Sequence, residues 1–187
     1  NVRKKPFNDV RVRRAVNYAV NKEAIVRNIL KGTATVSSGP IPPAITWAYT
    51  DAVTKYPYDP GRALRLLKDA GYAGGFSAVF WIPESGSGMQ SPKTMAQAIQ
   101  ADLAAVGIKV AIQTFEWGAY LNRYGKGMGA EADMAALSFM LDPGDPAPGG
   151  KAAAGPGRRQ RATAGAAQPP QERPRGSPRR GSDPGRD

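Results

Sequence analysis

NVRKKPFNDVRVRRAVNYAV (residues 1–20) joins an extended basic segment to an amphipathic helix. Asp9 is placed to cap this helix, because its carboxylate can accept the unpaired backbone N–H groups of the first turn. The arginines on the outer side are interpreted as a solvated face, with a phosphate-binding patch as the alternative. The buried face is predicted from the apolar residues at helical spacing: Val12, Ala15, Val16, Ala19 and Val20.

Two segments follow this helix. A second helix is predicted over 22–31, where Gly32 ends it. An irregular connection rich in Ser, Pro and Tyr is expected over 33–58. Its aromatic residues, which include Trp47, either line a pocket or pack the connection onto the domain, and packing is the favoured interpretation.

Farther along, helix and strand patterns alternate. Helices are predicted over 60–70 and 92–106, each opened by a capping Asp or Ser and a proline. Strands are predicted over 76–82 and 108–113, the second with apolar and polar residues alternating. Strand, helix and strand in this order form a βαβ unit, in which the two strands are parallel.

The last regular elements are a helix predicted over 117–124 and an apolar run at 134–141, which fits a buried central strand. The regular part of the chain, 1–146, is therefore predicted to be α/β. LDPGDP (141–146) follows the apolar run, where ligands of open α/β sheets tend to bind. The alternative is that its two aspartates only form turns with the neighbouring Pro and Gly.

Composition excludes several kinds of chemistry. The chain has no cysteine and no histidine, so disulfides, thiolate nucleophiles, Cys/His zinc sites and histidine-dependent triads are excluded. GSG (86–88) lacks the lysine and the spacing of a phosphate-binding loop. No apolar run approaches the roughly 18 residues that span a bilayer. The sequence therefore predicts neither an enzyme nor a cofactor or metal site.

The net charge of +11 favours an anionic partner, such as nucleic acid or a membrane surface. Residues 150–187 contain nine of the 26 basic and three of the 15 acidic residues, so about half of the excess lies in this segment. The segment has no aromatic residue and no Val, Ile, Leu or Met. Because it has almost nothing to bury, 147–187 is expected to be a disordered tail.

Two origins of this tail stay open. It is either an arginine-rich segment that binds RNA or membranes through charge, or the product of a GC-rich gene translated in the wrong frame. The second is favoured, because the change in composition falls within a motif. A nucleic-acid-associated protein acting through the tail is the alternative function.

Five motifs, in order, resemble the family 5 extracytoplasmic solute-binding proteins of peptide-type ABC importers. The resemblance implies that 1–146 is a partial second lobe of a type II periplasmic-binding-protein-like fold, and that the chain is a fragment without its first lobe. The motifs are the opening NVRKKPFNDVRVRRAVNYAV (1–20), GPIPP (39–43), YPYDPGRALRLLKDAGY (56–72), AQAIQADLAAVGIKV (96–110) and EWGAYL (116–121).

The resemblance also implies a function. Such proteins close two lobes around a solute and deliver it to a membrane permease. For this chain it implies a monomeric, periplasmic or extracytoplasmic receptor that needs no cofactor. The expected partners are a peptide or small amine-bearing solute and the ABC permease subunits, with no nucleic acid bound by the folded part.

The same resemblance assigns candidate ligand-binding residues. Asp142 takes the position of the aspartate that meets the peptide's α-ammonium group, and Phe139 stands where the family usually has a tryptophan wall. Asn1 matches an asparagine on the hinge-side strand. The basic residue that dipeptide binders can place near the solute carboxylate is not evident. The remaining candidates belong to a pocket-facing loop: Ser85, Ser87 and Met89.

Overall fold

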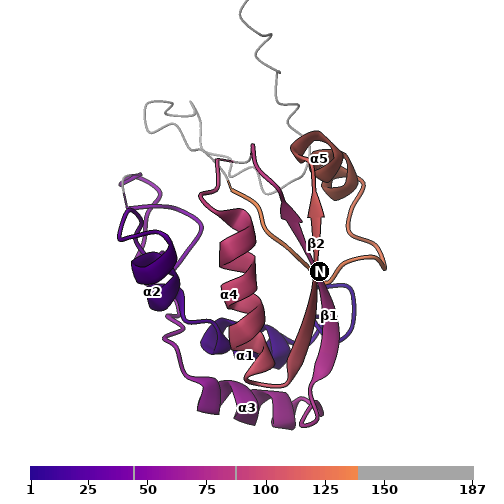
Figure 1. Ribbon diagram of the computed structural model, residues 1–187. Helices are drawn as coiled ribbons and strands as arrows, with labels where there is room; N and C mark the ends of the chain where they lie inside the picture. Colours follow the sequence, from indigo (N-terminus) through magenta and orange to yellow (C-terminus); the bar gives the residue numbers. More distant parts are fainter. Residues whose placement is uncertain (44, 87, 139–187) are drawn as a thin grey trace, which may run out of the picture. The chain divides into compact units, whose positions relative to one another are not determined.

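The computed structural model describes residues 1–43, 45–86 and 88–138 (Figure 1). Helices and strands alternate along most of this part of the chain. Their bounds are α1 (Val10–Ala19), α2 (Lys22–Ala24), the π-helix η1 (Ile25–Ile29), α3 (Pro60–Asp69), β1 (Phe76–Pro83), α4 (Pro92–Ala104), β2 (Ile108–Phe115), α5 (Trp117–Gly125) and β3 (Met134–Ala135).

The strands form a parallel sheet in the order β2-β1-β3. β1 pairs with β2 along its whole length, from Phe76 opposite Ile108 to Pro83 opposite Phe115. α4 connects these two strands, so the predicted βαβ unit is confirmed. Parallel strands need such a crossover, because the chain has to return to the same end of the sheet before the next strand begins. The α/β fold class predicted from the sequence is correct.

The two faces of the sheet are covered differently. One face contributes Phe80 and Ile108 to a core shared with α1, α3 and α4. The opposite face contributes Trp81, which is 1% exposed, to a smaller core with Tyr120 of α5. In Figure 1 α4 crosses the sheet along its length, whereas α5 lies near the ends of β1 and β2. α5 therefore covers the part of the sheet nearest the carboxyl ends of these strands.

α1 and α3 pack side by side and run antiparallel. The Asp59 backbone N–H donates to Tyr18 O (2.8 Å), and the Arg11 Nη1 donates to Asp69 O (2.7 Å), which joins each end of one helix to the opposite end of the other. The predicted cap is confirmed, since Asp9 accepts the Arg11 N–H. Tyr18 is buried although the apolar pattern did not predict it, because the loop's Tyr56 packs edge-to-face on its ring.

One predicted helix differs in type and one predicted cap is wrong. The helix expected over 22–31 is present from Lys22 to Ile29, but only its first three residues are α-helix and the rest is the π-helix η1. Ser91 does not cap α4: its φ is +47° and its side chain makes no capping bond. Proline at the first position supplies a fixed φ but no N–H, so α4 starts without a polar cap.

The third difference concerns the apolar run at 134–141. Only Met134–Ala135 forms a strand among the described residues, and it is an edge strand of the described sheet. β1 is the central strand instead. The described residues of the run, 134–138, are half-buried, so this part is apolar without being fully enclosed.

A close backbone approach requires glycine at the start of the sheet. Gly75 has a φ of +75°, and a Cβ built there would lie 1.9 Å from Gly107 O. Gly107 itself has a φ of +85°. Any side chain at Gly75 would force the turns before β1 and β2 apart, so the sequence can begin this parallel pair only with glycine.

Leu67 and Leu64 on α3 provide a matched test of this packing, because they are 1% and 48% exposed. Leu67→Ala should lower the free energy of unfolding by about 3 kcal/mol, since it leaves a cavity in the larger core. Leu64→Ala should change it by less than about 0.5 kcal/mol. Urea unfolding followed by circular dichroism measures both values. Equal losses would contradict this arrangement of α3.

Candidate functional site

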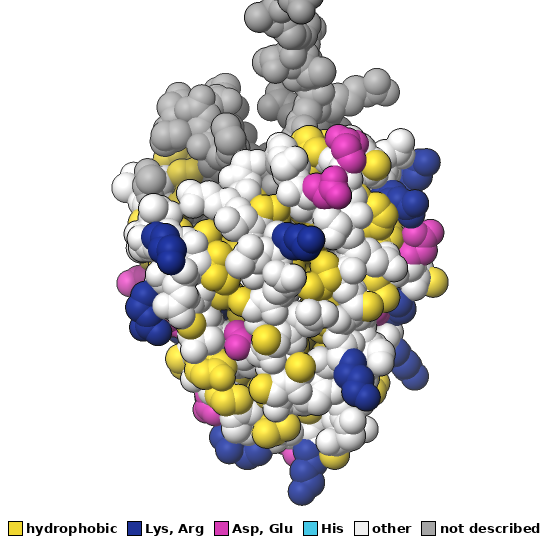
Figure 2. All heavy atoms as spheres, viewed as in Figure 1, with side chains coloured by type: hydrophobic (Ala, Val, Ile, Leu, Met, Phe, Trp, Pro, Cys, Tyr) yellow, Lys and Arg dark blue, Asp and Glu magenta, His cyan; other side chains and the backbone are white. Residues whose placement is uncertain are grey.

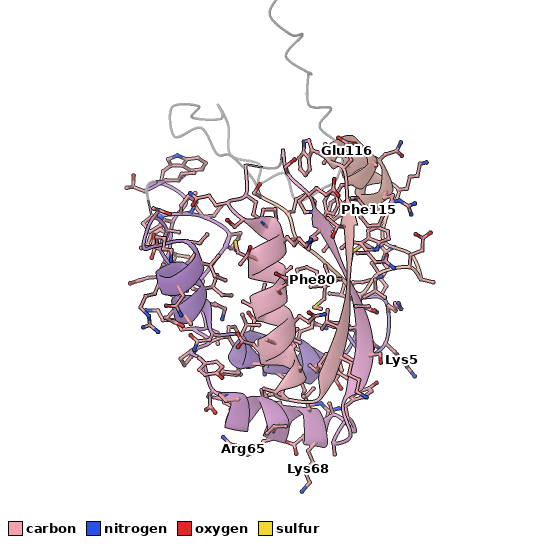
Figure 3. The ribbon with its side chains drawn as sticks, in the orientation of Figure 1. Lys5, Arg65, Lys68, Phe80, Phe115 and Glu116 are labelled. Atoms are coloured by element: carbon pink, nitrogen blue, oxygen red, sulfur yellow. The ribbon has the colours of Figure 1, made fainter. Side chains whose placement is uncertain are left out.

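The candidate site lies where β1 and β2 end. Pro83 is in register with Phe115, and the Glu84 N–H donates to Phe115 O (2.8 Å), which holds the two strand ends together. The 84–91 loop and the start of α5 continue from this edge. Figure 3 places Phe115 and Glu116 at this end of the molecule. In open α/β sheets, the crevice beyond the carboxyl ends of the strands is where ligands bind.

The 84–91 loop is held against α5 by a glycine. Gly86 has a φ of +79°, and a Cβ built there would lie 3.1 Å from the Trp117 side chain. The loop backbone at Gly86 therefore lies close to the Trp117 side chain, and its positive φ strains any residue other than glycine at this position. On the same loop, Ser85 is exposed and Met89 is half-buried. The described residues of the loop thus include both polar and apolar groups.

Glu116 is the N-cap residue of α5. Its carboxylate accepts the Gly118 N–H (2.9 Å) and the Ala119 N–H (3.0 Å). These backbone hydrogen bonds hold the pKa of Glu116 below its usual value, because they stabilise the ionised form. The sequence analysis did not predict this cap. A Glu between an alternating strand and a helix is the signal that could have identified it as a cap.

Aromatic packing anchors α5 at the site. Tyr120 is fully buried, its hydroxyl donates to Ala136 O, and burial raises its pKa to about 12. Trp117 and Tyr124 stack on the two sides of Tyr120 along the helix. On the sheet below, the Trp81 Nε1 donates to Gln113 Oε1 (2.9 Å). Packed aromatic side chains therefore support the carboxyl ends of β1 and β2.

The N-terminal segment is bound to the segment before β3. The Asn1 Nδ2 donates to Gly129 O (2.9 Å) and Ala132 O (3.0 Å), so its side-chain donors contact backbone carbonyls. Lys4 lies 3.0 Å from the Asp133 carboxylate. Asp133 is 4% exposed and also accepts the Val79 N–H (2.8 Å). We call this set of contacts the clasp: it consists of Asn1 and Lys4, Val79 of β1 and the segment 129–133. It joins three separate parts of the chain around the buried carboxylate of Asp133.

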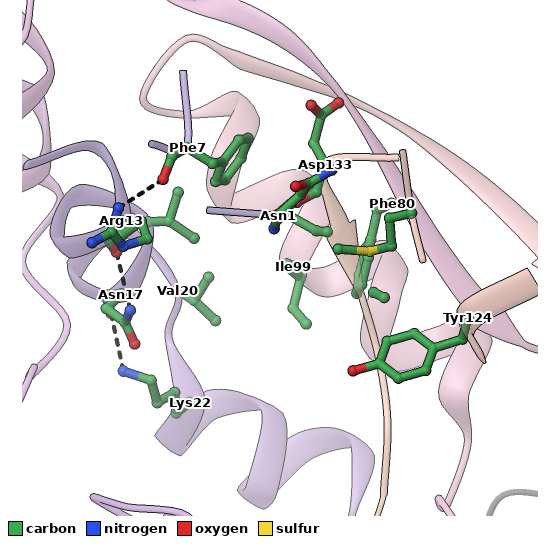
Figure 4. Close-up of a pocket in the computed structure, with 14 residues that line it drawn as sticks. Asn1, Phe7, Arg13, Asn17, Val20, Lys22, Phe80, Ile99, Tyr124 and Asp133 are labelled. Atoms are coloured by element: carbon green, nitrogen blue, oxygen red, sulfur yellow. Dashed lines mark hydrogen bonds between the residues drawn. The ribbon is translucent and has the colours of Figure 1, made fainter. Parts of the chain in front are cut away.

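A cavity of about 450 Å³ opens beside this clasp, between α1, α4 and β3 (Figure 4). Phe80, Ile99 and Met134 contribute to its apolar walls, and Arg13 and Lys22 contribute positive charge. Asn1 is also among its lining residues. The structure therefore places Asn1 at this cavity and the Ser85–Met89 loop at the ends of the strands.

The other predicted ligand-binding residues, Ser87, Phe139 and Asp142, lie outside the described residues. The hydrogen bonds of the Asn1 side chain go to Gly129 O and Ala132 O. Within the same ranges no group of three or more acidic residues could hold a metal ion, and no helix is long and apolar enough to cross a membrane. The ligand-binding roles stay predictions.

Comparison with known proteins identifies the family. The sequence model described as bacterial extracellular solute-binding proteins, family 5 middle, matches residues 1–160. The chain belongs to this family. The match extends past residue 146, where the sequence analysis placed the domain boundary. The family resemblance seen in the five motifs is confirmed.

Several characterised proteins are similar to this solute-binding family member. It is 42% identical over 147 residues to heme-binding protein A of Haemophilus influenzae, and 43% identical over 147 residues to the dipeptide-binding protein of Escherichia coli. Each alignment covers 78% of this chain but only 26% and 27% of the two relatives. The chain therefore spans about a quarter of the length of these relatives.

Solved structures agree with this assignment. The periplasmic binding protein DppA of Helicobacter pylori, in complex with the peptide STSA, matches with a TM-score of 0.66 and 40% identity over 76% of this chain and 27% of that one. A dipeptide-binding protein of Pseudoalteromonas, in complex with Met-Leu, matches with a TM-score of 0.63 and 31% identity over 67% and 25%. The fold is therefore that of part of a periplasmic binding protein.

The cap formed by Glu116 predicts a pH effect. Because its pKa is lowered in the folded state, its contribution to stability is present above the unfolded value and is lost as the pH falls through the lower folded value. Glu116→Gln should therefore reduce the loss of melting temperature between neutral and acidic pH. Melting curves across this range test the effect, with Glu131→Gln as the control. A parallel shift at every pH would contradict it.

The clasp predicts coupled mutations. Lys4→Met should lower the free energy of unfolding by about 2 kcal/mol, because it leaves the buried Asp133 carboxylate without its cation. Lys126→Met, at an exposed position, should have little effect. Combining Lys4→Met with Asp133→Asn should cost less than the sum of the single changes. Strictly additive losses in a double-mutant cycle would show that the pair does not interact.

Proposed function

We propose that this chain is part of the substrate-binding component of an ABC importer, which binds peptides or related small amine-bearing solutes. Solute would bind in a cleft between lobes, and closure of the lobes would enclose it for delivery to the permease. The proposed location is the periplasm or another extracytoplasmic compartment. The family match over 1–160 is the observation that carries the proposal.

The geometry of the strand ends supports binding at this edge. The ends of β1 and β2 are joined by strand pairing and by the Glu84 hydrogen bond, and Gly86 lies against Trp117 at the start of α5. Groups from several elements therefore meet here, and a solute bound at this place would contact more than one of them. Ser85 would contribute a hydroxyl, and Met89 an adaptable apolar contact.

The proposed anchor for the solute amine is Asp142. A carboxylate paired with an ammonium group forms a charge-assisted hydrogen bond, which is stronger than a neutral one. Its support is the position of Asp142 in the LDPGDP segment, three residues after Phe139, as in the family's motif. Phe139 would supply an aromatic wall for the solute, and Asn1 would contribute from the hinge side.

The chemistry of the described edge does not favour a nucleotide or metal-dependent reaction. The loop after β1 has neither the lysine nor the spacing of a phosphate-binding loop. Glu116 is committed to the first turn of α5. Binding without catalysis is therefore the activity that these residues support best, and specificity would depend on contacts from both lobes.

The test is a titration of the isotope-labelled chain with Met-Leu, followed by backbone amide NMR. Amide shifts are expected at Ser85, Gly86 and Trp117, with a dissociation constant of roughly millimolar order, because one partial lobe offers only part of the contacts. Asp142→Asn should abolish these shifts, whereas Asp145→Asn should preserve them. Acetylating the amino group of the dipeptide should have the same effect as Asp142→Asn.

Two outcomes would contradict the proposal. Shifts confined to the cavity lined by Phe80 and Ile99 would place the solute elsewhere. Equal shifts with the free and the acetylated dipeptide would remove the role of the ammonium group, and with it the reason to assign Asp142.

A further inference from the structure

The buried side chain of Tyr120 contacts segments that lead to the proposed solute site. Tyr120 lies within α5 and is 0% exposed. Its ring belongs to the smaller core, and its hydroxyl donates to Ala136 O, sixteen residues farther along the chain. A buried hydroxyl needs a hydrogen-bond partner, and here that partner is a backbone carbonyl just after β3. The hydrogen bond therefore joins α5 to the chain that leaves the sheet.

Ala136 is held through both of its backbone groups. Its N–H donates to Trp81 O (2.9 Å), which extends the pairing of β1 with β3. Its C=O accepts the Tyr120 hydroxyl. The next residue, Leu137, packs against the same small core as Tyr120. The point at which the chain leaves the sheet is therefore fixed by β1 and by α5 together.

The ring of Tyr120 supports a second segment of the same site. Trp117 stacks on it, with the ring centroids 5.9 Å apart and the ring planes 13° from parallel. A Cβ built at Gly86 would lie 3.1 Å from the Trp117 Cβ, so the 84–91 loop lies close to Trp117. Tyr120 is therefore linked to this loop through Trp117, and to the segment after β3 through its own hydroxyl.

We propose that Tyr120 is a positioning residue for solute binding: its hydroxyl fixes the start of the segment that carries Asp142. This inference rests on the proposed function, in which Asp142 holds the solute amine. Asp142 follows Ala136 by six residues. Because Ala136 is already held in the free protein, fewer conformations are open to these residues, and less conformational entropy is lost when the carboxylate meets the ammonium group.

The Tyr120 hydroxyl remains a donor over the whole neutral pH range. Burial, with a smaller contribution from Tyr124, raises the pKa of Tyr120 to about 12. The group is therefore protonated at neutral pH, and its hydrogen bond to Ala136 O does not depend on pH in that range.

Recognition of a dipeptide depends on the exact position of such groups. In Figure 2 the Lys and Arg side chains are spread over the face that is shown and do not gather into one patch. This face therefore offers no concentrated charge that would attract a charged solute from a distance. A dipeptide with both ends ionised also has no net charge. Short contacts, and the residues that position them, would therefore provide the affinity.

The test measures the dissociation constant of Met-Leu for the 187-residue chain by amide NMR. Tyr120→Phe removes the hydroxyl and keeps the ring. It should raise the dissociation constant about fivefold, which is the effect of one ordinary hydrogen bond. Tyr72→Phe removes a hydroxyl before β1, and Ala63→Gly weakens α3 by about as much as one lost hydrogen bond. Both controls should change the dissociation constant less than about twofold, because NMR observes binding to the folded chain.

Hydrogen exchange supplies a measurement that needs no solute. Tyr120→Phe should speed exchange of the Ala136 amide about fivefold relative to that of the Val79 amide, whose N–H donates to Asp133. Ala63→Gly should leave this ratio unchanged, because it acts on α3 and not on the segment after β3.

The outcomes separate this role from the proposed function. If Asp142→Asn abolishes binding but Tyr120→Phe leaves the dissociation constant within twofold, the positioning role is overturned and the proposed function stands. Equal increases for Tyr120→Phe and Ala63→Gly would assign the effect to stability and overturn the role as well, as would an unchanged exchange rate at Ala136. If the unaltered chain shows no shifts with Met-Leu, the proposed function fails and the role of Tyr120 fails with it.

Discussion

The buried carboxylate of Asp133 holds the described fold together at the point where three segments meet. A charge that is 4% exposed is destabilising unless polar partners replace its water. Lys4 supplies the opposite charge and Val79 supplies a backbone donor. In addition, the Asp133 N–H donates to Val79 O (3.0 Å), so the same residue begins the alignment of β3 beside β1. One residue, through its side chain and its backbone, therefore helps to set both the path of the N-terminal segment and the position of the edge strand.

The pairing of the strands also determines which groups meet at the carboxyl ends of β1 and β2. β1 is held between β2 and β3, so its end and the end of β2 are side by side, and the loops that leave them share one edge. Gly86 packs on Trp117, and α5 is anchored by the buried Tyr120. The proposed solute site thus lies on loops that leave an ordered sheet, which is the arrangement by which rigid scaffolds support binding.

Local sequence alone determined most of the element order: the Asp9 cap, the apolar spacing of α1 and the alternation in β2 each predict structure from neighbouring residues. The motifs also identified the family. Only the tertiary structure decided that Met134 begins an edge strand, that Glu116 caps α5 and that Asp133 is buried against Lys4. An aspartate directly before an apolar run gives a hint of burial. Its partner is 129 residues away along the chain, however, and only packing of the folded chain brings distant charges together.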